Sequence, residues 1–71
     1  MAKMTQKQKL MMGVLAMRMA GYDPVAQLTG YLQTGNAAYI TRKDGARAMI
    51  LEVNQNVIRK YLAEQCQMQV A

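Results

Sequence analysis

Residue types that enzymes use for acid–base and nucleophilic chemistry are scarce in this chain of 71 residues. It has no histidine, which is the usual general base near neutral pH, and only one cysteine and four acidic residues. Asp23 and Asp44 stand where they can cap helices, and Glu52 and Glu64 are twelve residues apart. Cys66 has no histidine to activate it, so we interpret it as an incidental free thiol. The sequence therefore predicts no enzymatic activity and no catalytic residue.

The same scarcity argues against a metal or cofactor site. With no histidine and a single cysteine, the chain lacks the ligands of a dedicated zinc site. Its glycines follow neither the P-loop spacing nor the dinucleotide-binding spacing, and we interpret them as helix punctuation. We expect no metal and no cofactor.

Side chains suited to recognition gather in the middle of the chain. Tyrosine and arginine are enriched at interaction hot spots, although a buried tyrosine whose hydroxyl reaches a partner is an equally good explanation for each tyrosine. Between Gly21 and Arg47 the chain holds three of its four tyrosines. We expect the partner-binding surface to consist of Tyr22, Gln27, Tyr31, Tyr39, Arg42 and Arg47.

The net charge of +5 fits either the solvated faces of a small basic protein or an anionic partner. Neutralising phosphates dominates affinity for DNA, so a helix-turn-helix DNA-binding factor is the alternative to a protein-binding module. The turn expected from Ala37 to about Thr41 is too short to serve as a recognition helix. Any DNA binding should therefore be weak and independent of sequence.

The elements that position these residues are expected to be helices, four or five in number. Thr5 begins a T-x-x-Q capping box, which predicts a helix from Thr5 to about Ala20. Asp23 is followed by a proline, the pattern of an N-cap and first helical residue, and this second helix should run to about Gln33.

The second half of the chain predicts a short turn and one longer helix. Asn36 can cap the turn from Ala37 to about Thr41, and Asp44 can cap a helix from Gly45 to Gln65. Asn54-Gln55-Asn56 is a run of weak helix formers, at which this last helix either continues or breaks. The fold class is therefore all-α, a compact bundle with a helix-turn-helix-like core.

Both long helices are apolar on two sides. Leu10, Val14 and Met17 form one stripe of the first helix, which should face the core. For a chain of this size, the gain from burying apolar surface is on the order of 105 kcal/mol, about the cost of ordering its residues. A second copy is the simplest cover for the remaining stripes. We expect a homodimer interface formed by Met11, Leu15, Met19, Leu51, Ile58 and Leu62.

The length allows one domain, residues 1–71, with a flexible N-terminus at 1–4 and a frayed C-terminus at 66–71. No apolar stretch approaches the roughly 18 residues of a membrane span, so we expect no membrane partner. A lone cysteine and the absence of an export signal predict a cytoplasmic protein.

The segment from Gly21 to Arg47 resembles the core of the IreB family, small regulatory proteins of Gram-positive bacteria. Its sequence is GYDPVAQLTGYLQTGNAAYITRKDGAR. The family pattern is G-Y-[ND]-P-x-x-Q-[ILV]-x-G-Y-[LV]-x-[ST]-G-[DN]-x-A-Y-I-x-R, then three residues, then A-R. Every fixed position is met without a gap, across more than a third of the chain.

The resemblance implies a non-enzymatic cytoplasmic regulator that forms a helical homodimer. In this family, a membrane Ser/Thr kinase with extracellular PASTA repeats phosphorylates N-terminal threonines, in a pathway that controls cell-envelope stress and cephalosporin resistance. Thr5 is the candidate phosphosite in this chain, although its expected role as an N-cap is by itself enough to explain a threonine there and is the favoured explanation. The expected partners are a second copy, an unidentified regulatory protein and a Ser/Thr kinase.

Overall fold

The computed structural model describes residues 3–69, and all regular secondary structure in that range is helical. Four α-helices are joined by short connections, with two 3-10 turns between the second and the third. In chain order they are α1 (Gln6–Met19), α2 (Pro24–Thr34), η1 (Ala37–Tyr39), η2 (Lys43–Gly45), α3 (Ala46–Leu51) and α4 (Gln55–Gln69). The predicted all-α class is confirmed.

The first helix begins and ends as its sequence predicts. The backbone N–H of Gln8 donates to the Thr5 hydroxyl over 3.1 Å, and the Thr5 N–H donates to the Gln8 side chain over 2.8 Å. This is the reciprocal bonding of a capping box. At the other end Gly21 takes the left-handed conformation (φ +88°), and the N–H of Tyr22 donates to the Met17 carbonyl. That bond closes a Schellman motif, which ends α1 at Met19.

The second helix is also bounded by the expected residues. The Asp23 side chain accepts from the N–H of Val25, and Pro24 fills the first helical position. Gly35 ends the helix in the left-handed conformation, one residue beyond Thr34. Asn36 then caps η1 through the N–H of Ala38, as predicted, although η1 ends at Tyr39 and not near Thr41.

Of the two alternatives for the segment predicted from Gly45 to Gln65, one continuous helix or a break at 54–56, the structure has the break. The segment is divided into α3 and α4 by residues 52–54, and α4 continues to Gln69. Asp44 does not cap α3: its φ is +53°, and Gly45 occupies the N-cap position without a side-chain bond. Asn54 instead accepts from the N–H of Asn56, so the run of weak helix formers begins a new helix.

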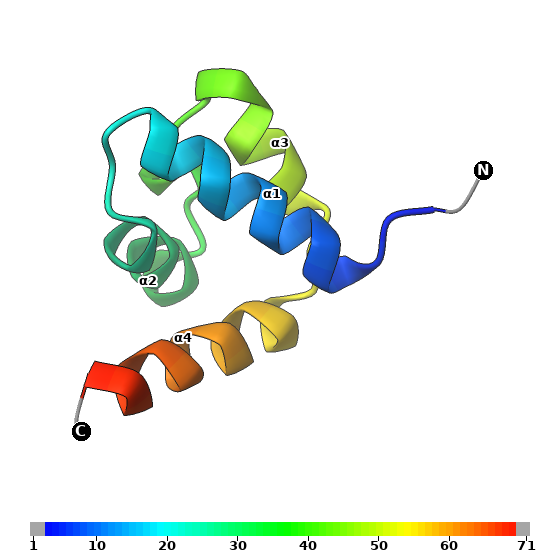
Figure 1. The fold of residues 1–71 in the computed structure, drawn as a ribbon. Coiled ribbons are helices and arrows are strands. Elements are labelled where there is room, and N and C mark those ends of the chain that lie inside the picture. The colour runs from blue at the N-terminus through cyan, green and yellow to red at the C-terminus, as the bar shows by residue number, and fades with distance from the viewer. Residues whose placement is uncertain (1–2, 70–71) are drawn as a thin grey trace.

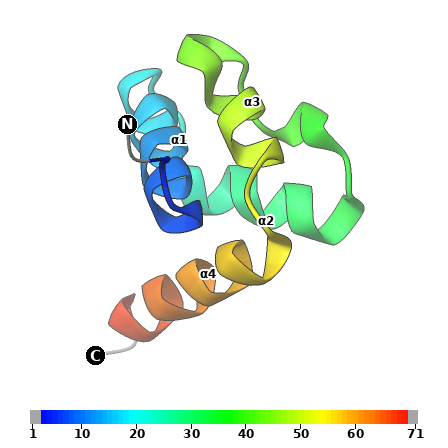
Figure 2. The same cartoon turned by 90° about the vertical axis from the view of Figure 1, so that its right-hand side faces the viewer.

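The core lies where α1 meets the three other helices. It includes the predicted stripe of α1, Leu10, Val14 and Met17, each at most 1% exposed. In Figure 1, α3 lies at one end of the molecule and α4 at the other, with α1 between them; in Figure 2, α1 stands beside α3, and α4 lies below both. The remaining large side chains that fill this core are Leu28, Tyr31, Ile40, Ile50, Val53, Ile58 and Tyr61.

Two glycines allow close packing. A Cβ on Gly13 would lie 2.7 Å from Cδ1 of Ile50, so the missing side chain lets α3 approach α1. A Cβ on Gly30 would meet the ring of Tyr39, which lies against the backbone of α2. Both contacts need a residue without a Cβ, and helix propensity alone disfavours glycine at both positions.

The start of α1 is tied to the break between α3 and α4. The Gln6 amide donates to the Glu52 carbonyl over 3.1 Å and accepts from the N–H of Asn54. Lys9 and Glu52 form an ion pair at 3.0 Å. These contacts fix where α4 departs from α3, beside the first turn of α1.

Candidate functional site

Three of the six predicted partner-binding residues are available at the surface. Tyr22 follows α1, Tyr39 ends η1, and both are 49% exposed. Arg42 is exposed in the connection before η2. Aromatic and guanidinium groups of this kind are the usual anchors of protein interfaces.

The other three predicted partner-binding residues make contacts within the subunit. This corrects the interpretation that they form a partner-binding surface. The Gln27 side chain accepts from the N–H of Thr41 over 3.0 Å, and Nε of Arg47 donates to the Ile40 carbonyl over 3.0 Å. Tyr31 is buried in the core. These contacts tie the irregular segment 35–45 to α2 and α3, and long-range bonds of this kind leave no trace in local periodicity.

The second apolar face of α1 is exposed. Met11, Leu15 and Met19 are 42%, 52% and 75% exposed, and Met12 lies beside them. Leu51, at the end of α3, is also exposed. Four of the six residues predicted at a homodimer interface therefore lie at the surface of the subunit, and contiguous apolar surface on a small protein often marks an interaction site.

Of the two remaining interface predictions, that of Ile58 is wrong, and that of Leu62 stays a prediction. Ile58 is fully buried in the subunit core, and Leu62 is partly buried against it. They were assigned to one exposed stripe with Leu51, on the assumption of a single helix. Because the helix is interrupted at 52–54, α4 runs in a different direction from α3. Its apolar side then packs onto α1 and α2.

Thr5 lies at the exposed start of α1, and its backbone and hydroxyl form the capping box. Three lysines lie within four residues of it along the chain: Lys3, Lys7 and Lys9. Lys3 and Lys7 are exposed, whereas Lys9 is engaged by Glu52. The hydroxyl is thus accessible in basic surroundings at the positive end of a helix dipole.

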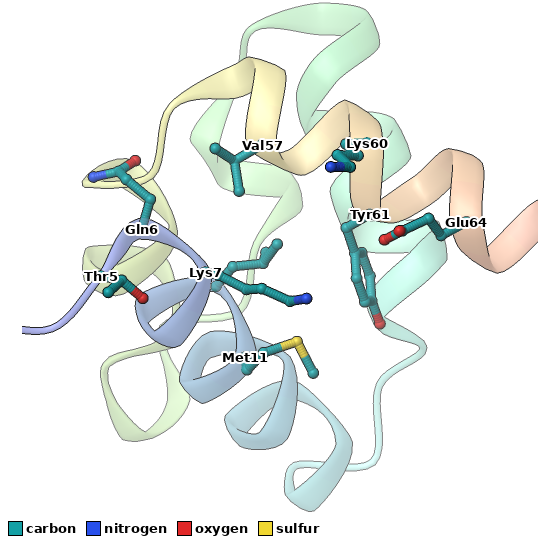
Figure 3. A pocket seen from close by; sticks show the side chains of 9 residues that line it. Thr5, Gln6, Lys7, Met11, Val57, Lys60, Tyr61 and Glu64 are labelled. Atoms are coloured by element: carbon teal, nitrogen blue, oxygen red, sulfur yellow. The ribbon is translucent and has the colours of Figure 1, made fainter.

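A cleft between the start of α1 and α4 was not predicted from the sequence. Its volume is about 350 Å³, and Figure 3 shows side chains from both helices around it. Its floor is apolar, and lysines from α1 and α4 lie on its wall. The lining residues are Thr5, Gln6, Lys7, Leu10, Met11, Val57, Lys60, Tyr61 and Glu64.

Sequence analysis missed this cleft because its two walls are 46 or more residues apart in the chain. The only local signal is the pair Lys60 and Tyr61 on the same helix as the apolar Val57. The direction of α4 depends on the break at 52–54, which periodicity did not decide.

The described residues hold no group of three or more His, Cys, Asp or Glu side chains placed to bind a metal ion. Among them, no helix is both long enough and apolar enough to cross a membrane. The side chain of Cys66 and residues 1–2 and 70–71 lie outside the described part, so the interpretations of this thiol and of the outermost termini fall outside it as well.

Comparison with known protein families gives one match. The family model described as IreB regulatory phosphoprotein covers residues 1–65. This extends well beyond the segment from Gly21 to Arg47, and includes Thr5, the exposed face of α1 and the first eleven residues of α4.

Proposed function

The chain belongs to the IreB family of regulatory phosphoproteins, and from this membership we propose that it is a non-enzymatic, cytoplasmic regulator that acts as a homodimer through protein–protein contacts. The observation that carries the proposal is the exposed apolar face of α1. A regulator without catalytic groups must act by binding, and this face carries several of the large apolar side chains exposed in the described part of the subunit.

A second copy is the occupant that best fits this face. Met11, Leu15 and Met19 recur at intervals of four residues, which places them along one side of the helix. Two such stripes can pack against each other about a two-fold axis, the commonest arrangement of homodimers. Leu51 at the end of α3 could extend the buried area.

Light scattering at about 100 μM protein tests the dimer. Wild-type protein should have about twice the mass of one chain, and Leu15→Asp should be monomeric because it places a charge in the apolar interface. Ala26→Asp is the matched control, since it adds the same charge at an exposed position on α2. A wild-type mass equal to that of one chain would refute the dimer.

The partner surface is the second part of the proposal. We assign it to the exposed Tyr22, Tyr39 and Arg42, which the tight α1–α2 turn and the segment 35–45 present. In a pull-down, Arg42→Glu should lose a captured regulatory protein, whereas Lys43→Glu, with the same charge change at the next residue, should retain it. Equal retention by both variants would place the partner elsewhere.

Regulation by a Ser/Thr kinase is the third part, with Thr5 as the site. Thr34 donates its hydroxyl to the Gly30 carbonyl, and Thr29 and Thr41 are partly buried, whereas Thr5 is exposed at the start of α1. A phosphate at Thr5 would oppose the positive end of α1 and pair with nearby lysines, and should not melt the helix. We place this kinase, with PASTA repeats, in the envelope-stress and cephalosporin-resistance pathway of the family.

Incubation with the PASTA-repeat kinase and ATP, followed by peptide mapping, tests this part. Phosphate should appear on Thr5 and be absent from Thr5→Ala. Phosphate on Thr34 or Thr41 in place of Thr5 would refute the assignment.

DNA binding has less support than protein binding. The turn η1 is three residues long, and α2 carries no lysine or arginine. Arg47, the only basic residue of α3, is bonded to the Ile40 carbonyl. Affinity for duplex DNA should therefore be sequence-independent and fall steeply between about 50 and 200 mM salt. A sequence-specific complex that survives about 200 mM salt would favour the DNA-binding alternative.

A further inference from the structure

The cleft between α1 and α4 has the chemistry of a small-molecule site. Leu10, Val57 and the ring of Tyr61 provide apolar surface, and a volume of about 350 Å³ is within the range of ligand pockets. Polar groups lie at the wall, where they could orient a ligand. The dimer and partner surfaces proposed above do not account for these residues, except for Met11 and Thr5 at its edge.

The charged groups around the cleft favour an anion. Lys7 comes from α1 and Lys60 from α4, and neither forms an ion pair with a carboxylate in the described part of the chain. Glu64 is the only acidic residue on the lining. In the view of Figure 3, the Tyr61 ring stands between the Lys7 ammonium and the Glu64 carboxylate, so the positive side of the cleft is the one next to Lys7.

The backbone adds to this positive side. Gln6 and Lys7 are the first two residues of a helix of 14 residues, and such N–H groups have no partner within the helix. Gln6 and Lys7 both line the cleft, so the start of α1 borders it. Helix N-termini with free N–H groups are favourable places for an anionic group.

Tyr61 forms one side of the cleft. The residue is 8% exposed, and its buried hydroxyl has no hydrogen-bond partner in the described chain. Because that oxygen is closed to solvent, a ligand in the cleft would contact the ring of Tyr61 and not its hydroxyl.

We propose that this cleft binds a small organic anion, a molecule with one carboxylate or phosphate group on an apolar body. The acidic group lies at the start of α1, between Lys7 and Lys60, and the apolar body lies over Leu10, Val57 and the Tyr61 ring. Occupation of the cleft holds α4 against α1, because the ligand contacts both helices. The site shares Met11 with the exposed face of α1 and otherwise uses different residues from the stripe around Leu15.

Calorimetry and NMR with three probes of equal chain length test the proposal: octanoate, 1-octanol and octylammonium. The full-length protein is prepared without kinase, so that Thr5 carries a free hydroxyl. Octanoate should bind about tenfold more tightly than 1-octanol, because charge-assisted hydrogen bonds orient its carboxylate, and octylammonium should bind least. Chemical-shift changes should centre on Leu10, Val57 and Tyr61.

Charge-removal variants locate the acidic group. Lys7→Gln and Lys60→Gln should each weaken octanoate binding about tenfold and leave 1-octanol binding unchanged. Lys43→Gln is the matched control, since it removes the same charge outside the lining, and should bind octanoate as the wild type does. Equal affinity for the three probes, unchanged octanoate binding in both lining variants, or shifts centred on Leu15 would overturn the proposal.

Discussion

The two faces of α1 have similar composition but different surroundings. One face, with Leu10, Val14 and Met17, is buried against α3 and α4, whereas the other, with Met11 and Leu15, is about half exposed. Both faces have helical spacing, so periodicity alone gives them equal claim to a core position. The difference shows that an apolar stripe identifies a surface to be covered but does not identify its cover.

The core face of α1 is covered because residues 52–54 interrupt the last helical segment and separate α3 from α4. The break allows α3 to pack on one side of α1 and α4 to approach from another, and Gln6 bonds to both sides of the break. The exposed face has no helix left to cover it within the described residues. Its cover must come from another molecule, or it stays in water.

The largest expected effect is a difference in the free energy of unfolding between two truncated variants, one on each face of α1. Leu10→Ala should lower the free energy of unfolding by about 2–5 kcal/mol, because it leaves a cavity in a packed core. Leu15→Ala should change it by less than about 0.5 kcal/mol in dilute protein. Urea denaturation at low and high protein concentration measures both. A loss for Leu15→Ala that appears only at high concentration would indicate that a second copy covers this face.

A smaller effect is expected at the contact that brings α3 onto the core face. Gly13→Ala should destabilise by about 1–3 kcal/mol through a clash with Ile50, although alanine is the better helix former by about 1 kcal/mol. Adding Ile50→Val removes the clashing Cδ1 and should recover part of the loss, which a double-mutant cycle measures. Stabilisation by Gly13→Ala alone would show that α3 is not so close to α1.

The smallest effect is expected at the only buried side-chain polar atom without a partner in the described chain. Tyr61→Phe removes an unpaired hydroxyl while keeping the ring, so it should be neutral or stabilising by up to about 1 kcal/mol. Thermal unfolding measures this, with Tyr22→Phe as an exposed control. A loss above about 1 kcal/mol would show that the hydroxyl has a partner within the protein.

The local boundaries of the fold were predictable because short-range chemistry determines them. Thr5, Asp23 and Asn36 cap the elements that their sequences suggest, and Gly21 and Gly35 end α1 and α2. Asp44 was the exception. It looks like a cap in sequence, but Asp44 and Gly45 both take a left-handed conformation, so Asp44 does not stand at the N-cap of α3.

The candidate sites were less predictable, because contacts distant in sequence decide which polar residues are free. Gln27 and Arg47 have the composition of a binding surface, yet both bond to the backbone of the segment that follows α2. Tyr22 and Arg42 look the same in sequence and are exposed. Nothing in the sequence connects the cleft residues Lys7 and Lys60, because only the direction of α4 brings them to the same cleft.

By itself, the sequence determined the helical class, the caps of α1 and α2, the core stripe of α1 and the family to which the chain belongs. These depend on neighbours within a few residues, or on a motif read directly from the chain. The tertiary structure alone decided where the last helical segment breaks, which tyrosines are buried, and that α4 meets the start of α1 to form a cleft. Those features depend on the balance between a weak helix stretch at 54–56 and the contacts of Gln6 and Lys9, which lie more than 40 residues away in sequence.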